Sequence, residues 1–238
     1  MLAAHNALPR EGHLAAAFRI YSYLKTKPNA RIIFDPTYAD IDHESFPQEN
    51  WTEFYGDVSE AIPPNAPRPL GKSVEVRCYV DADHAGDKLT RRSRTGLIVL
   101  LNSAPIVWFT KTQNTVETST FGSEFVALKI ATEILRGLRY KLRMMGIPIA
   151  GPSYAYCDTN SVVTNSSSPA STLKKKSNSI AYHCVRESVA ADEQRVTYES
   201  THTNLADILT KPLPGGQHRD YLVSQILYDI MPPSAAVA

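Results

Sequence analysis

Two aspartates that directly follow a short apolar run are the first residues of this chain with an evident chemistry. Cys78, Tyr79 and Val80 favour a strand, and Asp81 and Asp83 come next in the phrase YVDADHAGD. Because side chains two residues apart point to the same face of a strand, the two carboxylates are predicted to project together from its end. Mg²⁺ prefers such oxygen ligands. A polar turn is the alternative interpretation, since Asp and Gly are common turn residues.

Two further acids favour a metal site over a turn. The long helix predicted to begin at Ser119 or Thr120 has an apolar stripe made of Phe121, Phe125, Leu128, Leu135, Leu138, Leu142 and Met145. Glu124 lies only about 20° from Leu135 around that helix, where an unpaired carboxylate is costly to bury. Glu124 therefore needs a cation, or else it lies at a partly hydrated end of the stripe. Asp158 follows the strand-like run 154–157, as Asp81 follows its own run.

The elements that must position these acids follow one another in a mixed α and β order. Strands are predicted at 73–80, 95–101 and 105–110, and the short links between them imply an antiparallel meander. The long helix comes next, then a strand at 154–157, a short helix at 161–165, a helix ending near 191 and a strand at 195–199. A helix opening within 203–211 carries Asp207, and a last amphipathic segment covers 221–230.

The first seventy residues are predicted to be a separate unit. Leu14, Phe18, Tyr21 and Leu24 have the spacing of an amphipathic helix, and residues 31–34 favour a short strand. From 35 to 72 proline is frequent and periodicity is lost, as in an extended linker or a loop held against a neighbouring surface. We therefore place a domain boundary near residue 70, and a loose tail at 232–238.

Composition limits the classes of function. Of the 238 residues 43% are hydrophobic, and 25 Lys and Arg against 24 Asp and Glu give a net charge of +1. Bulk charge thus predicts no polyanionic partner, so a nucleic-acid contact must come from local basic patches. The three cysteines form no CxxC pair, which argues against a disulfide framework or a zinc site and favours a reduced compartment. No run has the length of a membrane span, and the start lacks the pattern of a signal peptide.

Five phrases in a fixed order carry a resemblance to a known family. YVDADHAGD, RRSRTG, STFGSEFVAL, YCDTNSVV and ADILTKPL succeed one another across residues 79–213. This order resembles the ribonuclease H domain of copia-type retrotransposon Pol polyproteins. The earlier phrase REGHLAAAFRIYSYLK resembles the end of the reverse transcriptase that precedes this domain. The resemblance covers nearly the whole chain up to Ile230.

The resemblance implies a fold, a division into domains and a metal-ligand set. The fold is an α/β ribonuclease H-like fold with a five-stranded mixed sheet in the order 3-2-1-4-5, flanked by helices. Residues 1–70 would be the end of the reverse transcriptase or a connection segment with its Pro-rich linker, and 71–231 the ribonuclease H-like domain. The implied catalytic and metal-binding carboxylates are Asp81, Glu124, Asp158 and Asp207. Only the resemblance selects Asp207, and Asp83 remains an accessory group or a substitute.

The implied activity is Mg²⁺-dependent hydrolysis of the RNA strand of an RNA–DNA hybrid. Four carboxylates would hold two Mg²⁺ ions, with Mn²⁺ as a substitute, about 4 Å apart. Expected partners are the hybrid and the reverse transcriptase portion of the same polyprotein, in a cytoplasmic virus-like particle or the nucleus. The candidate nucleic-acid contacts are Arg91, Arg92, Arg94, Asn160, Ser161, Lys174, Lys175 and Lys176. A solvated surface is the alternative for each of them.

Two histidines and two rival functions remain to be placed. His202 precedes Asp207 by five residues, where relatives of this fold place a mobile histidine that helps product release, but a plain loop residue is the alternative. His183 matches a family position and is expected to be structural. The rival to an active nuclease is a non-catalytic remnant that serves as a nucleic-acid-binding or connection module. A transposase or resolvase of the same fold is weaker, because ADILTK and the reverse-transcriptase phrase do not belong to it. No YxDD-like polymerase site is present in the 238 residues.

Overall fold

The computed structural model describes residues 7–173 and 176–229, which fall into two compact units. One unit contains the residues up to Ile33 together with those from Ile226 onward, and the other is Phe34–Gln225. Lys174, Lys175 and the predicted tail at 232–238 lie outside the described residues. None of the helices within the described ranges is both long and apolar enough to cross a membrane.

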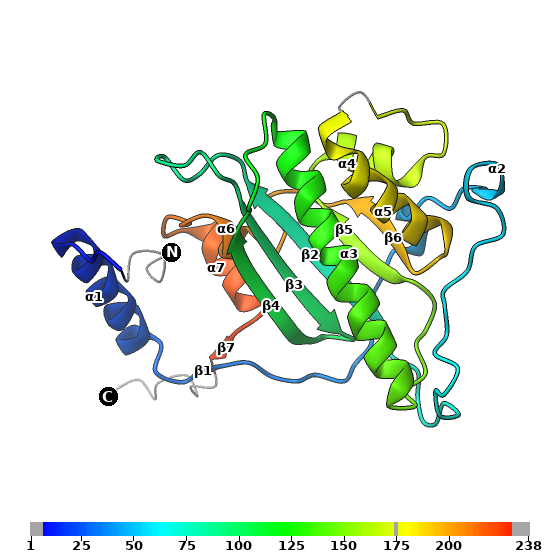
Figure 1. Ribbon diagram of the computed structural model, residues 1–238. Helices are drawn as coiled ribbons and strands as arrows, with labels where there is room; N and C mark the ends of the chain where they lie inside the picture. The colour runs from blue at the N-terminus through cyan, green and yellow to red at the C-terminus, as the bar shows by residue number, and fades with distance from the viewer. Residues whose placement is uncertain (1–6, 174–175, 230–238) are drawn as a thin grey trace. The chain divides into compact units, whose positions relative to one another are not determined.

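The smaller unit contains the predicted N-terminal helix. This helix, α1 (Glu11–Thr26), is followed by β1 (Ala30–Arg31), which pairs antiparallel with β7 (Tyr228–Asp229) (Figure 1). The strand predicted at 31–34 is wrong beyond Arg31, since within the described residues β1 pairs with β7 only through Ala30 and Arg31. None of the residues of α1 is buried, and each side chain of its predicted stripe is more than half exposed.

The larger unit is built on a five-stranded mixed sheet. Its strands are β2 (Val76–Asp83), β3 (Arg94–Leu101), β4 (Ala104–Thr112), β5 (Ser153–Cys157) and β6 (Gln194–Tyr198). The spatial order is β4-β3-β2-β5-β6. The first three strands pair antiparallel through short links, whereas β5 and β6 pair parallel after helical crossovers. Since β2 to β6 are the predicted strands one to five, the predicted order 3-2-1-4-5 is confirmed.

The long helix lies against this sheet (Figure 1). It is α3 (Thr120–Met144), and Ser119 is its N-cap, because the Ser119 side chain accepts a hydrogen bond from Gly122 N. The remaining helices are α2 (Thr52–Tyr55), α4 (Asn160–Ser167), α5 (Ser179–Ala190), α6 (Asp207–Thr210) and α7 (Gln217–Ser224), with short 3₁₀ turns at His43–Ser45 and Lys176–Asn178.

The last two helices differ from the prediction. The helix predicted to open at residue 203 is a single turn that begins at Asp207. The amphipathic segment predicted at 221–230 begins earlier, after Gly216, and ends at Ser224, because the chain then enters strand β7 at Tyr228.

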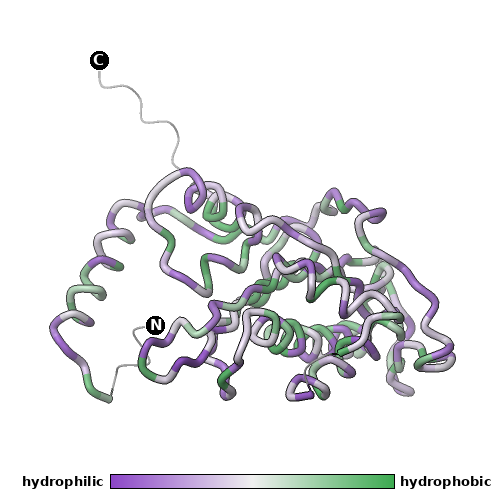
Figure 2. Tube along the Cα trace, turned by 90° about the horizontal axis from the view of Figure 1, so that it is seen from above, coloured by the Kyte–Doolittle hydropathy of each residue, from purple (hydrophilic) through white to green (hydrophobic). Residues whose placement is uncertain are grey.

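The main core lies between the sheet and α3. It contains alternate residues of β2 (Val76, Cys78 and Val80), which pack with Phe125, Leu128 and Leu135 of the helix. Figure 2 shows hydrophobic segments inside this unit and hydrophilic segments along many of its loops. The alternation in β2 follows from the two-residue period of a strand with one face on a core.

Residues 34–70 belong to the larger unit and pack on its sheet and core, so they do not form a free linker. Ile41 and Phe46 form a second buried cluster with Tyr154 of β5, and Thr197 Oγ1 of β6 donates to Ser45 O at 2.6 Å. Further along, Trp51 joins the main core. The compact unit therefore begins at Phe34 and not near residue 70, because the segment after Asp35 carries isolated anchors that periodicity does not reveal. Of the two sequence interpretations, the loop held against a neighbouring surface is the one observed.

Candidate metal centre

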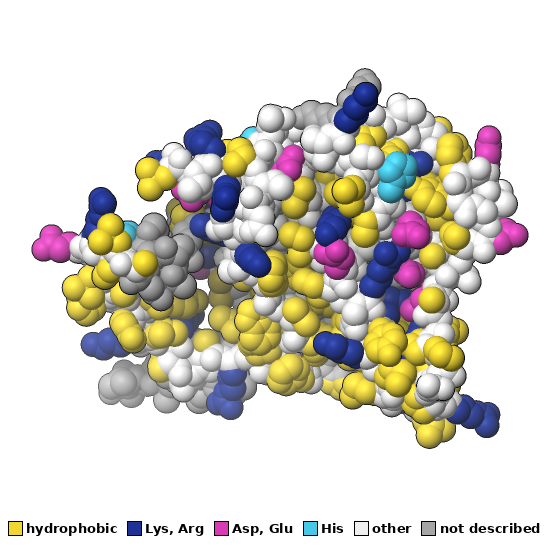
Figure 3. Space-filling view, viewed as in Figure 1, with side chains coloured by type: hydrophobic (Ala, Val, Ile, Leu, Met, Phe, Trp, Pro, Cys, Tyr) yellow, Lys and Arg dark blue, Asp and Glu magenta, His cyan; other side chains and the backbone are white. Residues whose placement is uncertain are grey.

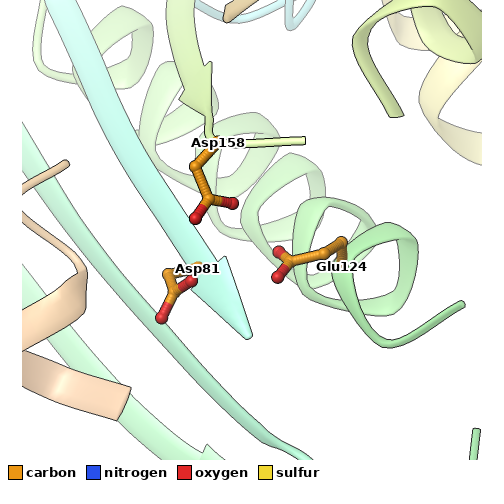
Figure 4. A group of neighbouring side chains, drawn as sticks. All are labelled: Asp81, Glu124 and Asp158. Atoms are coloured by element: carbon orange, nitrogen blue, oxygen red, sulfur yellow. The ribbon is translucent and has the colours of Figure 1, made fainter. Parts of the chain in front are cut away.

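Three carboxylates from three different elements converge at one end of the sheet. Asp81 lies near the end of β2, Asp158 directly follows β5, and Glu124 lies near the start of α3. One oxygen from each can be chosen so that all lie within 4.8 Å of one another. Figure 4 shows the three carboxylates turned toward a common space. The sequence prediction that these three acids meet is therefore confirmed.

Local structure explains why they meet. Strands β2 and β5 are parallel neighbours, and Val80 pairs with Cys157. The residues that follow this pair, Asp81 and Asp158, therefore occupy equivalent positions on adjacent strands. Glu124 is placed by the capped start of α3, which packs against β2.

Burial and mutual repulsion raise the pKa values of two of these acids. Asp81 is 1% exposed and Glu124 is 4% exposed. Burial raises the pKa of Asp81 to about 6, although the Thr210 hydroxyl and the Lys211 ammonium oppose the shift. Burial, with the charges of Asp81 and Asp158, raises the pKa of Glu124 well above its usual value. Both carboxyls are thus poor at holding charge without an additional cation.

The fourth predicted acid lies beside this group without joining it. Asp207 is buried at the first position of α6, and its Oδ1 lies 2.8 Å from Lys211 Nζ. Asp207 and Asp81 are linked through α6, because Thr210 Oγ1 donates to Asp81 Oδ2 and Lys211 Nζ lies 3.9 Å from that same oxygen. The group of three acids within 4.8 Å does not include Asp207.

Close packing brings α6 onto the sheet. Gly96 of β3 pairs with Asp81 of β2, and a Cβ added at Gly96 would lie 2.6 Å from Thr210 Cγ2 and 3.1 Å from Ala206 O. Only a glycine permits this approach, so α6 can carry Asp207 to the same end of the sheet as Asp81.

Sequence reasoning missed two threonines that hold the acids. Thr201 Oγ1 donates to Asp158 Oδ2 at 3.0 Å, and the carbonyl oxygen of Thr201 lies 3.2 Å from His218 Nε2. Thr210 holds Asp81, as described above. A lone threonine carries no signal of its own. Lys211, by contrast, stands four residues after Asp207, and that helical spacing was available as a signal.

Asp83, His202 and His183 do not belong to the group of three acids whose oxygens lie within 4.8 Å of one another. Asp83 folds over its own turn, so that a Cβ added at Gly86 would lie 1.8 Å from Asp83 Oδ2. His202 is exposed, and its ring lies edge-on to that of His218 with centroids 5.4 Å apart. His183 is also exposed, and its Nδ1 is 3.1 Å from the Tyr55 hydroxyl.

The predicted nucleic-acid contacts occupy different positions. Asn160 and Ser161 are exposed at the start of α4, two and three residues after Asp158. Arg91 and Arg92 are exposed in the loop before β3, whereas Arg94 is partly buried and its Nη1 donates to Thr210 O at 3.4 Å. Lys176 is exposed, and its two neighbours lie outside the described residues. On the side of the molecule that Figure 3 shows, Lys and Arg side chains lie at several separate places and not in one patch.

The donor set fits a hard divalent cation. The three residues supply only carboxylate oxygens, which are the ligands that Mg²⁺ prefers. Two of the carboxyls are buried and have raised pKa values, so a bound cation would stabilise their charged forms. Asp81, Glu124 and Asp158 would hold the ion, and Asp207 shares its ion-pair partner Lys211 with Asp81.

Comparison with known proteins gives the chain its relatives. No family model matches it. The chain is 30% identical over 227 residues to the retrovirus-related Pol polyprotein from transposon RE1 of Arabidopsis thaliana, and this match covers 95% of the chain. It is 34% identical over 143 residues, or 60% of the chain, to the Pol polyprotein from transposon RE2 of the same plant.

The chain is similar to a segment of retrovirus-related Pol polyproteins. It spans only 13% and 10% of the length of the two Arabidopsis polyproteins. Among solved structures, LC11-RNase H1 in complex with an RNA/DNA hybrid is 14% identical with a TM-score of 0.46, and the match covers 57% of this chain and 94% of that one. The sheet order of the chain and the succession of its elements are those that the resemblance in the sequence implied.

Proposed function

We propose that this Pol segment is a Mg²⁺-dependent endonuclease that hydrolyses the RNA strand of RNA–DNA hybrids during reverse transcription. The observation that carries the proposal is the convergence of Asp81, Glu124 and Asp158 at one end of a ribonuclease H-like sheet. An all-carboxylate site suits phosphodiester hydrolysis, in which the ions must offset developing negative charge on phosphate oxygens. Mn²⁺, which accepts the same oxygen ligands, would be a substitute.

The residues of the site have distinct tasks in this proposal. Glu124 and Asp81 hold protons more readily than ordinary carboxyls, and they become ligands once those protons leave. Thr201 keeps Asp158 oriented toward the other two acids through its hydrogen bond to Oδ2. When bound, Mg²⁺ would supply Lewis-acid polarisation of the phosphate and a more acidic water molecule.

Substrate choice is assigned to the polar start of α4. Asn160 and Ser161 are exposed there, immediately after Asp158, so a strand whose phosphate lies at the metal site would pass them. Side chains of this kind recognise 2′-hydroxyl groups and phosphates in a shallow minor groove, which distinguishes an RNA strand by its shape and not by its base edges. The exposed Arg91, Arg92 and Lys176 are assigned to backbone phosphates.

Cleavage of a labelled hybrid tests the proposal. The wild-type chain with Mg²⁺ should cut the RNA strand, and Asp158→Asn should reduce the rate at least about a hundredfold while the protein stays folded. Asp220→Asn is the matched control, because Asp220 is an exposed aspartate on α7. The nuclease assignment is wrong if wild type fails to cut with either Mg²⁺ or Mn²⁺, or if Asp158→Asn cuts equally well.

A non-catalytic connection module is the second candidate. The observation that favours it is the ion pair between Asp207 and Lys211, which engages the fourth acid within the chain itself. Binding of the hybrid without Asp158-dependent cleavage would support this reading. The same experiment therefore separates the two candidates.

We also propose that the residues up to Ile33 are the end of a reverse transcriptase segment. The reverse transcriptase portion of the same polyprotein would then be a partner of this chain. The relative from transposon RE1 matches 95% of the chain, so the likeness extends beyond the sheet unit. The exposed apolar stripe of α1 supports a neighbour there. Loss of binding to the polymerase portion after replacing Phe18 and Tyr21 by serine, with the fold retained, is the expected result.

A further inference from the structure

Lys211 places a positive charge directly on the proposed metal site. Its Nζ lies 2.8 Å from Asp207 Oδ1 and 3.9 Å from Asp81 Oδ2. The side chains of both acids are only 2% exposed, whereas that of Lys211 is 36% exposed. Within residues 7–173 and 176–229, no ion pair joins Glu124 or Asp158 to a basic side chain. Among the described residues, the ammonium of Lys211 is thus the cation that forms ion pairs with this group of acids.

An ordinary helical ion pair does not account for this arrangement. Lys129 and Glu133 form such a pair on α3, with Nζ and Oε1 2.7 Å apart and both side chains substantially exposed. That pair joins two residues of one helix at the surface. Lys211 instead contacts two buried acids, and one of them, Asp81, belongs to strand β2.

We propose that Lys211 is an internal counter-cation that competes with divalent ions for Asp81 and Asp207. The proposal rests on the metal site of the proposed function. Without metal, the ammonium holds Asp207 and offsets the repulsion among the clustered carboxylates. When an ion binds, the ammonium leaves for solvent, which its partial exposure and flexible four-carbon stem permit. Lys211 therefore stabilises the metal-free protein. It also weakens ion binding, because a group that favours the metal-free state opposes a ligand that favours the metal-bound state.

Calorimetric titration with Mg²⁺ alone tests this competition. Lys211→Met keeps the length of the side chain and removes its charge. This variant should bind Mg²⁺ about tenfold more tightly than wild type. In EDTA its melting temperature should be about 5 °C lower than that of wild type. Lys211→Arg keeps the charge and should stay close to wild type in both measurements. Lys129→Met, in the exposed pair on α3, should change neither.

Unchanged or weaker Mg²⁺ binding by Lys211→Met would overturn the proposal. If that variant does not fold in EDTA, Lys211→Gln, which can still hydrogen-bond Asp207, replaces it with the same expectation. Failure of the proposed function gives a different result. If Lys211→Met binds Mg²⁺ more tightly but the wild-type chain does not cut the hybrid, the role of Lys211 stands and the nuclease assignment fails. If the wild-type chain cuts the hybrid but Lys211→Met does not bind Mg²⁺ more tightly, only the role of Lys211 fails.

Discussion

Glu60 Oε2 lies 2.7 Å from Arg139 Nη2, although the two residues are 79 positions apart in the chain. Arg143 donates to the same carboxylate, and Arg139 also donates to Gly151 O at 3.0 Å. Arg139 is almost fully buried on the sheet-covering helix α3. The segment before β2 is therefore fixed to α3 by charge as well as by the apolar anchors Phe46 and Trp51.

Removing the charge of Glu60 should destabilise the fold. Glu60→Gln would leave the buried guanidinium of Arg139 without a counter-charge, which costs on the order of 3 kcal/mol. Urea denaturation measures the loss. Glu133→Gln is the control, because Glu133 is an exposed acid on α3 that pairs with Lys129 at the surface, and it should cost less than about 0.5 kcal/mol. Equal effects of the two changes would show that the Glu60 pair contributes no more than a surface pair.

The contribution of Glu60 should also depend on pH. Burial alone would raise the pKa of Glu60, but hydrogen bonds and charge from Arg139 and Arg143 outweigh it and lower the pKa from 4.5 to about 2. Because the unfolded chain binds this proton more readily, the stabilisation is complete above the unfolded value and is lost as pH falls from there toward 2. The difference in urea midpoint between wild type and Glu60→Gln should therefore shrink between about pH 5 and about pH 2. A constant difference would contradict the assignment.

Truncation should locate the true start of the folded unit. A chain that begins at Phe34 keeps Phe46, Trp51 and Glu60, and it should melt cooperatively near the temperature of the full chain. A chain that begins at residue 71 loses all three contacts and should melt at least about 10 °C lower or fail to fold. Circular dichroism melts decide between these outcomes. Similar melting of both chains would restore the boundary near residue 70.

The sequence allowed the sheet and three of the four acids to be predicted for identifiable reasons. The two-residue period of Val76, Cys78 and Val80 marks a strand with one buried face, and acids directly after strands are visible in the sequence itself. Glu124 stood out because a carboxylate within an apolar stripe is costly. In each case a local pattern carried the information.

Other parts of the site depend on contacts that local patterns do not encode. Asp207 begins a helix of one turn, which is too short to show periodicity, and only the resemblance to Pol polyproteins selected it. Thr201 reaches Asp158 across 43 positions, and Phe46 reaches Tyr154 from a segment without periodicity. Single contacts between distant residues become visible only in the folded chain.

Gly96 controls how close α6 comes to the sheet. Gly96→Val would place Cβ 2.6 Å from Thr210 Cγ2 and 3.1 Å from the backbone oxygen of Ala206, so α6 must move away. Thr210 and Asp207 would then lose their positions around Asp81. In the Lys211→Met background, where no ammonium competes for the site, Mg²⁺ binding should weaken at least about tenfold while the far-ultraviolet circular dichroism stays native. Gly137→Ala is the control, since nothing lies within 4 Å of a Cβ at this exposed position of α3. That change should leave Mg²⁺ binding unaltered and stabilise the helix by about 0.5–1 kcal/mol. An unchanged Mg²⁺ affinity when Gly96→Val is added to Lys211→Met would show that the site does not need α6 at its present distance from β3.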